Sequence, residues 1–277
     1  MAWGGGMSDP FQPCEEKFKI TQQLIDLSNE YKIPILFSTK SDTVYNAKIN
    51  PDLHSFQLSI TNLENRKDLE PNIPDIESRY QFFKKLKSEG FKVGIRLQPF
   101  IPNVTTLDIV KKFKEADHFT IEGIKLVPQN KEQKEYILKL LNLDKNDFKQ
   151  MGLLNLKPEI RLSLYEPFID FFKQNNLSYS ISDNDLRKIS NNGCCCGDHL
   201  VQKSTSFNIT NMINKYGEYT KEQLDKELKN NKIENCICSQ LFSSNRTQGC
   251  KTVQEFYDKR FYKKISPFSP LFQYNQI

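Results

Sequence analysis

The amino-acid sequence predicts an α/β protein built on a parallel sheet. Up to about residue 130, apolar or β-branched segments alternate with charged helical patterns about every 25 residues. Strand, helix and strand at this spacing imply parallel pairing through right-handed crossovers. Each predicted strand ends in polar residues, which favours a barrel-like sheet over a doubly wound one, because the catalytic groups of (β/α) barrels lie at the carboxyl ends of the strands.

The four predicted strands share a short apolar core followed by polar side chains. They are residues 33–39, 55–61, 92–97 and 118–126. Three helices are predicted between them, at residues 15–31, 77–89 and 106–116, and Gly90 is expected to end the second. Their expected apolar faces are formed by Phe18, Leu24 and Leu27 in the first helix, and by Tyr80, Phe83 and Leu86 in the second.

The rest of the chain differs from this core in its residue pattern and composition. Residues 131–190 are predicted to be mostly helical and polar, with helices at 131–141 and 167–174 and one strand at 177–181. After residue 191 the sequence becomes rich in cysteine, with one helix expected at 221–230. We therefore expect a barrel-like core at 1–130, a helical or mixed continuation at 131–190 and a cysteine-bearing extension at 191–277.

Composition excludes several classes of protein. The 277 residues are 38% hydrophobic and 26% charged, which argues against intrinsic disorder. The formal net charge of +5 permits a nucleic-acid partner without indicating one. No segment approaches the roughly 18 apolar residues of a membrane span, and the first residues resemble neither a signal peptide nor a transit peptide. We expect a cytoplasmic protein with no membrane partner.

Seven cysteines are present, and six of them lie in the last third of the chain. An odd total with this clustering is a poor disulfide framework, so a metal or redox role in a reducing compartment is the first hypothesis. Two of the three consecutive cysteines, together with Cys236 and Cys238, would suffice for a four-thiolate zinc or iron–sulfur site. The alternative is buried cysteines without a ligand. The candidate metal ligands are Cys194, Cys195, Cys196, Cys236, Cys238 and Cys250.

Polar residues at the predicted strand ends are the candidate binding residues. Lys40 follows a buried strand, where it would hold a carboxylate by charge or act as a Schiff-base nucleophile; the alternative is a solvated loop lysine. Ser59 and Thr61 alternate with apolar neighbours and therefore face one side, and Arg96 and Gln98 do the same one strand later. The glycines at 4–6 form a weak phosphate-loop candidate or a flexible terminus.

Several motifs follow one another in a specific order within residues 3–128. They are Gly-Gly-Met-Ser-Asp-Pro at 5–10, Ser-Thr-Lys-Ser-Asp at 38–42, Leu-Ser-Ile-Thr at 58–61, Leu-Glu-Pro at 69–71 with Arg79, and Gly-Ile-Arg-Leu-Gln-Pro at 94–99. In this order they resemble the radical S-adenosylmethionine superfamily, specifically its spore photoproduct lyase-like branch.

The resemblance implies a partial (β/α)6 TIM-like barrel that holds S-adenosylmethionine against a [4Fe–4S] cluster. Cleavage of the cofactor would yield a 5′-deoxyadenosyl radical that abstracts hydrogen from a substrate the sequence does not name. By the same resemblance, Lys40 would pair with the methionine carboxylate, and Ser59 would contact the ribose. Gly5, Gly6 and Ser8 match the segment that binds the methionine amino group, and Arg96 and Gln98 would reach cofactor or substrate.

The family's CxxxCxxC cluster loop precedes its Gly-Gly motif, and no CxxxCxxC occurs in this sequence. We therefore expect a barrel that lacks its first βα unit. The favoured explanation is that the sequence is a fragment. The alternatives are a split enzyme, whose cluster loop comes from a second polypeptide, and an inactive relative. The terminal cysteines would then hold an auxiliary cluster or zinc. The branch permits a nucleic-acid substrate, and the alternative function is a non-catalytic metal-binding or partner-binding protein derived from this fold.

Overall fold

The computed structural model describes residues 2–3, 8–127, 130–151, 153–183, 185–192 and 197–201, and the single positions 223 and 226. The chain divides into two units, Met1–Ser204 and Thr205–Ile277, and the helices and strands discussed below belong to the first. Several predicted cofactor-binding and metal-binding residues lie outside these ranges. So does the predicted helix at 221–230, apart from positions 223 and 226. The binding residues concerned are Gly5, Gly6, Cys194, Cys195, Cys196, Cys236, Cys238 and Cys250.

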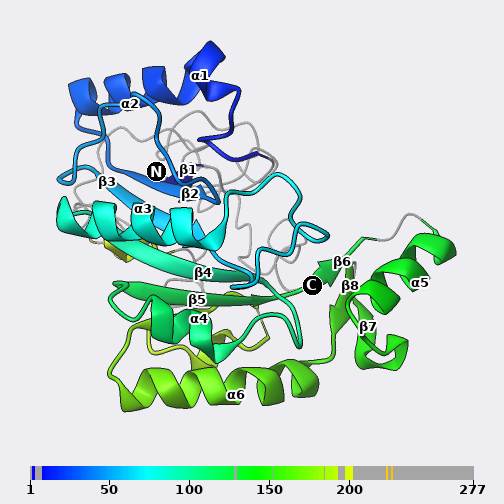
Figure 1. Ribbon diagram of the computed structural model, residues 1–277. Coiled ribbons are helices and arrows are strands. Elements are labelled where there is room, and N and C mark those ends of the chain that lie inside the picture. The colour runs from blue at the N-terminus through cyan, green and yellow to red at the C-terminus, as the bar shows by residue number, and fades with distance from the viewer. Residues whose placement is uncertain are drawn as a thin grey trace, which may run out of the picture. The chain divides into compact units, whose positions relative to one another are not determined.

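The main sheet has six parallel strands in the order β1-β2-β3-β4-β5-β9 (Figure 1). The strands follow one another in chain order, as in a barrel, without the reversal of a doubly wound sheet. This confirms the predicted α/β class with a barrel-like parallel sheet. The strands are β1 (Ala2–Trp3), β2 (Ile35–Thr39), β3 (His54–Ser59), β4 (Lys92–Phe100), β5 (His118–Gly123) and β9 (Tyr179–Ile181).

The first predicted helix is two helices, α1 (Glu15–Phe18) and α2 (Ile20–Tyr31), separated by Lys19 in the left-handed region (φ 54°). The predicted apolar face is wrong here, because Phe18 and Leu27 are at least half exposed. The break turns α2 so that Thr21, Ile25 and Ser28 are buried instead.

Helix α3 (Ile76–Ser88) agrees with its prediction. Asp75 caps its first turn by accepting from the Ser78 backbone N–H, and Phe83 and Leu86 are buried. Gly90 follows the helix with φ +86°, a conformation that favours glycine. Helix α4 (Leu107–Lys112) is shorter than predicted. Helix α6 (Pro158–Gln174) is longer than the helix predicted at 167–174, because it begins at Pro158. Proline is favoured at the first position of a helix.

Residues 125–156 include a second, antiparallel sheet that the sequence analysis did not predict. It has the order β6-β8-β7, with β6 (Lys125–Leu126), β8 (Leu153–Leu156) and β7 (Phe148–Met151). The predicted strand at 118–126 is therefore wrong as one strand, because β5 ends at Gly123 and β6 pairs elsewhere. Helix α5 (Lys131–Leu140) packs Leu138 into the small core of this sheet.

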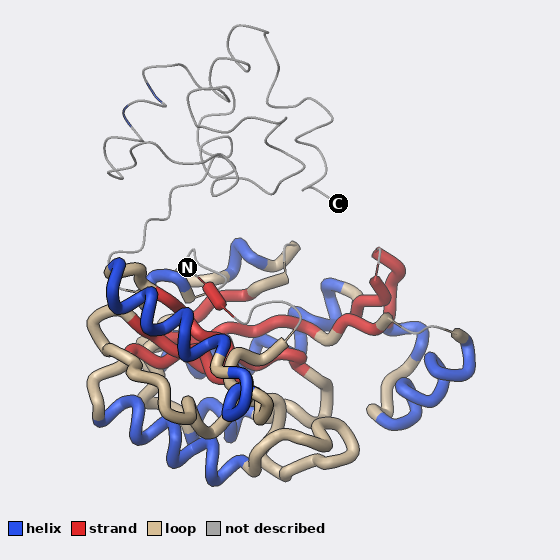
Figure 2. Tube along the Cα trace, turned by 90° about the horizontal axis from the view of Figure 1, so that it is seen from above, coloured by secondary structure: helices blue, strands red, loops and turns tan. Residues whose placement is uncertain are grey.

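The two faces of the main sheet differ in chemistry. Alternate residues such as Phe37, Phe56, Ile95, Phe119 and Tyr179 join one apolar core with side chains of the flanking helices. Figure 2 shows the strands and helices of this unit from above. Because side chains alternate along a strand, the intervening residues lie on the opposite face. The helices thus bury one face and leave the other for polar side chains.

Candidate site at the carboxyl edge of the sheet

The polar face of the sheet consists of two cross-strand rows. The strand register aligns Ser38, Gln57, Gly94 and His118 in one row, and Ser59, Arg96, Thr120 and Ser180 in the next. Their side chains share one face because register partners in a sheet point the same way. Alternation along the sequence predicted this for Ser59 and Arg96, and the register brings both into the same row.

Asp9 ties the segment that contains Ser8 to the end of β2. Its carboxylate accepts hydrogen bonds from the Lys40 backbone N–H (2.6 Å) and the Thr39 hydroxyl (2.7 Å), and also from the Phe11 backbone N–H (2.9 Å). Ser8 is exposed and adjoins this anchor. Sequence reasoning missed the role of Asp9, whose signal is an aspartate able to accept from the backbone N–H two residues later.

Lys40 lies one residue beyond β2 and forms an ion pair with Glu70. Glu70 comes from the loop that follows β3, and its carboxylate also accepts a 3.5 Å contact from the Thr61 hydroxyl. The Lys40 side chain is 30% exposed and that of Glu70 is 11% exposed. Lys40 is therefore a partnered cation at the edge of the sheet, with part of its side chain accessible to a ligand.

Ser59 ends β3 in a half-buried position, and its carbonyl oxygen accepts a hydrogen bond from Arg79 Nη1 (3.0 Å). Arg79 projects from α3 and is only 3% exposed. Burial lowers the pKa of Arg79, although Glu70 and Asp75 raise it through space. Arg79 Nε is buried and has no hydrogen-bond partner among the described residues. Arg79 belongs to one of the motifs found in the sequence, but no role was predicted for it.

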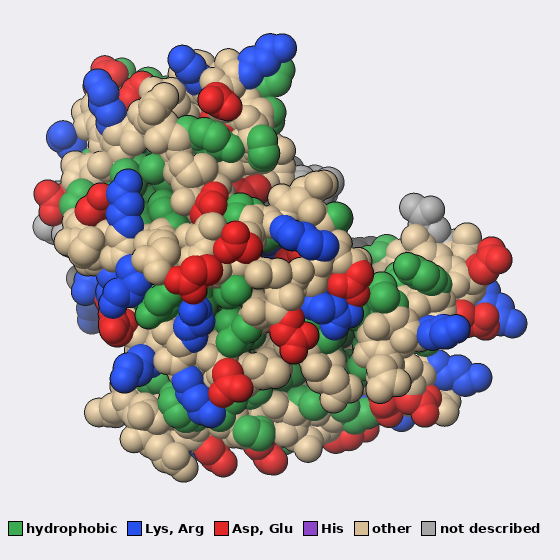
Figure 3. All heavy atoms as spheres, viewed as in Figure 1, with side chains coloured by type: hydrophobic (Ala, Val, Ile, Leu, Met, Phe, Trp, Pro, Cys, Tyr) green, Lys and Arg blue, Asp and Glu red, His purple; other side chains and the backbone are tan. Residues whose placement is uncertain are grey.

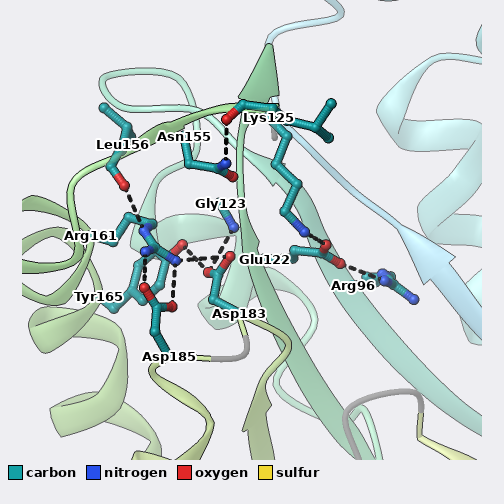
Figure 4. A network of polar contacts seen from close by, with 11 residues as sticks. Arg96, Glu122, Gly123, Lys125, Asn155, Leu156, Arg161, Tyr165, Asp183 and Asp185 are labelled. Atoms are coloured by element: carbon teal, nitrogen blue, oxygen red, sulfur yellow. Dashed lines mark hydrogen bonds and ion pairs between the residues drawn. The ribbon is translucent and has the colours of Figure 1, made fainter. Parts of the chain in front are cut away.

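Arg96 on β4 is held by an acidic partner on the neighbouring strand. Its Nη2 donates to Glu122 (2.7 Å) and its Nη1 to Gln57 (3.2 Å), while Lys125 forms a second ion pair with Glu122. Figure 4 shows Glu122 between these two cations. Burial raises the pKa of Glu122, but hydrogen bonds from Lys125 and Arg96 outweigh it and lower the pKa overall. Gln98 is half-buried further along β4.

A chain of hydrogen bonds crosses the polar face from Arg96. Gln57 accepts from Arg96 and donates its amide N–H to the Thr120 hydroxyl (3.2 Å), which lies 3.4 Å from the Ser180 hydroxyl. Ser180 in turn is 2.9 Å from His118 Nε2. The polar face is therefore one connected network, and sequence reasoning missed its inner members.

A second network fixes the carboxyl end of β5 (Figure 4). Asp183 accepts from the Gly123 backbone N–H (3.1 Å) and the Tyr165 hydroxyl (2.9 Å) and pairs with Arg161 (3.1 Å). Arg161 also binds Asp185 through both terminal nitrogens. Burial and the neighbouring Asp183 raise the pKa of Tyr165. Because these polar groups are mutually satisfied, we assign the network to stability.

The described residues contain no group of three or more His, Cys, Asp or Glu side chains that would hold a metal ion. The one cysteine among them, Cys14, is free and exposed at the start of α1. The predicted terminal ligands lie outside the described ranges. The iron–sulfur and zinc predictions therefore have no donor set within the part of the chain that the structure describes.

The face shown in Figure 3 carries acidic and basic side chains interspersed with one another. This distribution matches the mild net charge and favours no polyanionic partner on that face. A search of the described residues for a helix long and apolar enough to cross a membrane found none.

Comparisons with known proteins were made on both sequence and structure. No family model matches the chain. An uncharacterized protein of Methanocaldococcus jannaschii is 28% identical over 146 residues, which cover 47% of this chain and 52% of that protein. The chain thus spans about half the length of this curated relative.

Among solved structures, the chain is similar to spore photoproduct lyase complexed with dinucleoside spore photoproduct. The match has a TM-score of 0.47 and 16% identity, covering 64% of this chain and 58% of that one. Streptococcus suis SuiB matches with a TM-score of 0.44 and 14% identity, covering 75% and 43%. Spore photoproduct lyase, whose branch the motif order resembles, is therefore among the solved structures similar to this chain. At these identities the likeness concerns the fold alone.

Proposed function

We propose that this chain is a radical S-adenosylmethionine enzyme-like protein that binds S-adenosylmethionine at the carboxyl edge of its parallel sheet. One observation carries the proposal. Lys40 lies one residue beyond β2, Ser59 ends β3, and Arg96 is the register partner of Ser59 on β4. Asp9 anchors the segment that contains Ser8 to Lys40. This arrangement offers a cation, hydroxyl groups and a guanidinium on one edge, which suits a ligand with a carboxylate, an amine and ribose hydroxyls.

Each residue has a definite part in the proposal. Lys40 would bind the methionine carboxylate, exchanging part of its interaction with Glu70 for the ligand. Ser8 would accept from the methionine amino group, and Ser59 would contact the ribose. Arg96 and the half-buried Gln98 line the next strand, where they would reach the adenosyl group or a substrate.

The family's [4Fe–4S] cluster, when joined to S-adenosylmethionine, supplies radical chemistry. The described residues do not fit this cluster, because they offer no set of thiolate ligands. We therefore assign no radical step to them. In the proposal, the ligands of this cluster come from sequence beyond this chain or from a second polypeptide, and the terminal cysteines hold an auxiliary cluster or zinc. The substrate remains a proposal too, and nucleic acid is the class that the spore photoproduct lyase-like branch suggests.

Calorimetric titration with S-adenosylmethionine tests the cofactor site directly. We expect Lys40→Ala to weaken binding by about 1.5–3 kcal/mol, the scale of a hydrogen bond to a charged group. Lys87→Ala is the matched control, because Lys87 is also half-buried and paired with an aspartate (Asp117, 2.6 Å) at the opposite edge of the sheet. This control should bind as the wild type does.

A double variant separates lost attraction from new repulsion. Lys40→Ala alone leaves the Glu70 carboxylate facing the carboxylate of the ligand, whereas Lys40→Ala with Glu70→Gln removes both charges of the pair. We expect the double variant to recover part of the affinity while remaining weaker than the wild type. Equal affinity of wild type and Lys40→Ala would contradict the assigned site. Binding without turnover would favour the non-catalytic alternative.

A further inference from the structure

We propose that a second, anion-binding pocket lies between the loop after β3 and helix α3, and that it takes a phosphate group. The proposal is independent of S-adenosylmethionine binding. The pocket is lined by Asn62, Asn65, Arg66, Lys67, Glu70 and Arg79, with Ile73 and Pro74 at its side. Its interior has room for about one water molecule, the size of a single phosphate oxygen, and it is bordered by the exposed Lys67 and the half-exposed Arg66.

Arg79 is the first observation that points to an anion. Its guanidinium is almost fully buried, yet among the described residues it forms no ion pair and a single hydrogen bond, to the neutral carbonyl of Ser59. Arg79 Nε has no hydrogen-bond partner within the part of the chain that the structure describes. A buried charge is costly unless it is paired and hydrogen-bonded. A bound oxyanion would supply both the counter-charge and the missing acceptor.

The two asparagines provide the second observation. The Asn62 side-chain oxygen accepts from the backbone N–H groups of Glu64 (3.0 Å) and Arg66 (3.4 Å). The Asn65 side-chain oxygen accepts from the Ile76 backbone N–H (2.6 Å). With each oxygen so engaged, the amide NH₂ groups of the buried Asn62 and the exposed Asn65 are the atoms that can donate to a ligand. The lining therefore presents donors, as oxyanion sites do.

The charges around the pocket allow an anion. Arg66, Lys67 and Arg79 contribute three positive charges to its lining, against the single carboxylate of Glu70. Glu70 is already paired with Lys40, and Arg66 with the exposed Asp68. Counting these partners gives four cations and two carboxylates, and Asp75 and Asp42 act on Arg79 through space without an ion pair to it among the described residues. The geometry thus favours a phosphate oxygen on Arg79 and the asparagine amides, with the remaining oxygens facing Lys67.

The sharpest test replaces a donor without removing a structural hydrogen bond. Asn65→Asp retains the oxygen that accepts from Ile76 at the start of α3, but it exchanges the NH₂ donor for a second, negatively charged oxygen. A carboxylate at a helix N-terminus is stabilising, so this variant should fold. The matched control is Asn130→Asp, because Asn130 caps the distant helix α5 in the same way by accepting from the Gln133 N–H (2.8 Å).

Equilibrium dialysis with labelled inorganic phosphate, at constant ionic strength and without S-adenosylmethionine, gives the readout. We expect saturable binding by the wild type and by Asn130→Asp, and binding weaker by about tenfold or more in Asn65→Asp, the scale of one hydrogen bond to a charged group. Arg79→Gln should lose binding as well. Adenosine 5′-monophosphate in a parallel titration distinguishes the source: tighter binding than inorganic phosphate assigns a nucleotide phosphate, and equal binding assigns the free ion.

Two results would overturn the proposal. One is the absence of saturable phosphate binding by the wild type. The other is an Asn65→Asp variant that is folded by circular dichroism and binds phosphate as tightly as Asn130→Asp does. Because S-adenosylmethionine is absent throughout, failure here leaves the proposed cofactor site untouched, and failure of the Lys40 titration leaves this pocket untouched.

Discussion

His118 makes the stability of this protein depend on pH, and the effect can be worked from its surroundings. The imidazole is fully buried, with its two ring nitrogens 2.8 Å from the Ser178 hydroxyl and 2.9 Å from the Ser180 hydroxyl. Burial, aided by the nearby His199, lowers the pKa of His118 from 6.5 to about 3. The ring is therefore neutral in the folded protein near neutral pH.

The sign follows from proton linkage. Below pH 6.5 the unfolded chain binds a proton at His118, and the folded protein does not until the pH approaches 3. Stability is therefore fully present above pH 6.5 and is lost as the pH falls through this window. At pH 5 the loss from His118 amounts to about 2 kcal/mol relative to pH 8.

His54 adds a second loss of the same sign. Burial lowers the pKa of His54 to about 4, and its Nδ1 accepts from the Asn50 N–H (2.8 Å), which a proton on that nitrogen would prevent. This contributes a further loss of about 2 kcal/mol by pH 5. We therefore expect His118→Gln, and separately His54→Gln, each to remove about half of the wild-type loss.

Urea unfolding at pH 8 and pH 5, in the presence of a thiol reductant, measures these differences. The quantity to compare is the change in unfolding free energy between the two pH values, so any constant cost of the substitution cancels. The double variant should show little loss over this range. If His118→Gln loses as much stability between pH 8 and pH 5 as the wild type does, the assignment of a neutral buried imidazole is refuted.

Two further predictions concern the carboxyl edge. Arg96→Ala removes the guanidinium that donates to both Glu122 and Gln57. Breaking a buried ion pair costs about 3–5 kcal/mol of unfolding free energy. We expect a loss at the low end of this range, because Lys125 still pairs with Glu122. Gly123→Ala places a methyl group 2.8 Å from the Tyr165 hydroxyl, inside the buried network, and should cost about 1–3 kcal/mol in the same urea assay.

Each of these variants has a control within the chain. Lys84→Ala breaks an exposed ion pair with Glu115 and should cost no more than about 1 kcal/mol. If it cost as much as Arg96→Ala, the larger effect expected at Arg96 could not be attributed to the burial of that pair. In Gly94→Ala the new methyl group approaches the terminal Cδ1 of Leu200 at 3.0 Å, the His118 carbonyl oxygen at 3.4 Å and the His118 Cβ at 3.8 Å. It should be milder than Gly123→Ala, and the reverse order would contradict the packing described.

The main sheet could be predicted because most of its strands coincide with short apolar segments at a regular spacing in the sequence. The second sheet could not. Strand β6 has two residues and β7 and β8 have four each, too short to show a period, and β6 follows β5 after a single residue. Nothing in the local pattern marks the change at Ile124, where the chain leaves one sheet for the other.

The candidate site could be predicted only in part, for a similar reason. Alternation along one strand predicted that Ser59 and Arg96 share a face with their neighbours. The partners that define their environment come from loops and helices: Asp9, Glu70 and Arg79 meet the strand ends through tertiary packing. Local periodicity carries no information about which loop residue reaches which strand, so these three stayed unassigned.

The polar network connects this edge to His118 in one direction. Arg96 has only donors, so Gln57 must accept from it with its oxygen and donate its NH₂ to Thr120. Thr120 then has its own hydrogen to give to Ser180, and Ser180 gives its hydrogen to His118 Nε2. This places the imidazole hydrogen on Nδ1. A proton on Nε2 would remove the acceptor of the Ser180 hydroxyl and leave one hydroxyl hydrogen of the Ser180–Thr120 pair without an acceptor among the described residues. The order of donors that begins at the Arg96 guanidinium therefore helps to keep His118 neutral.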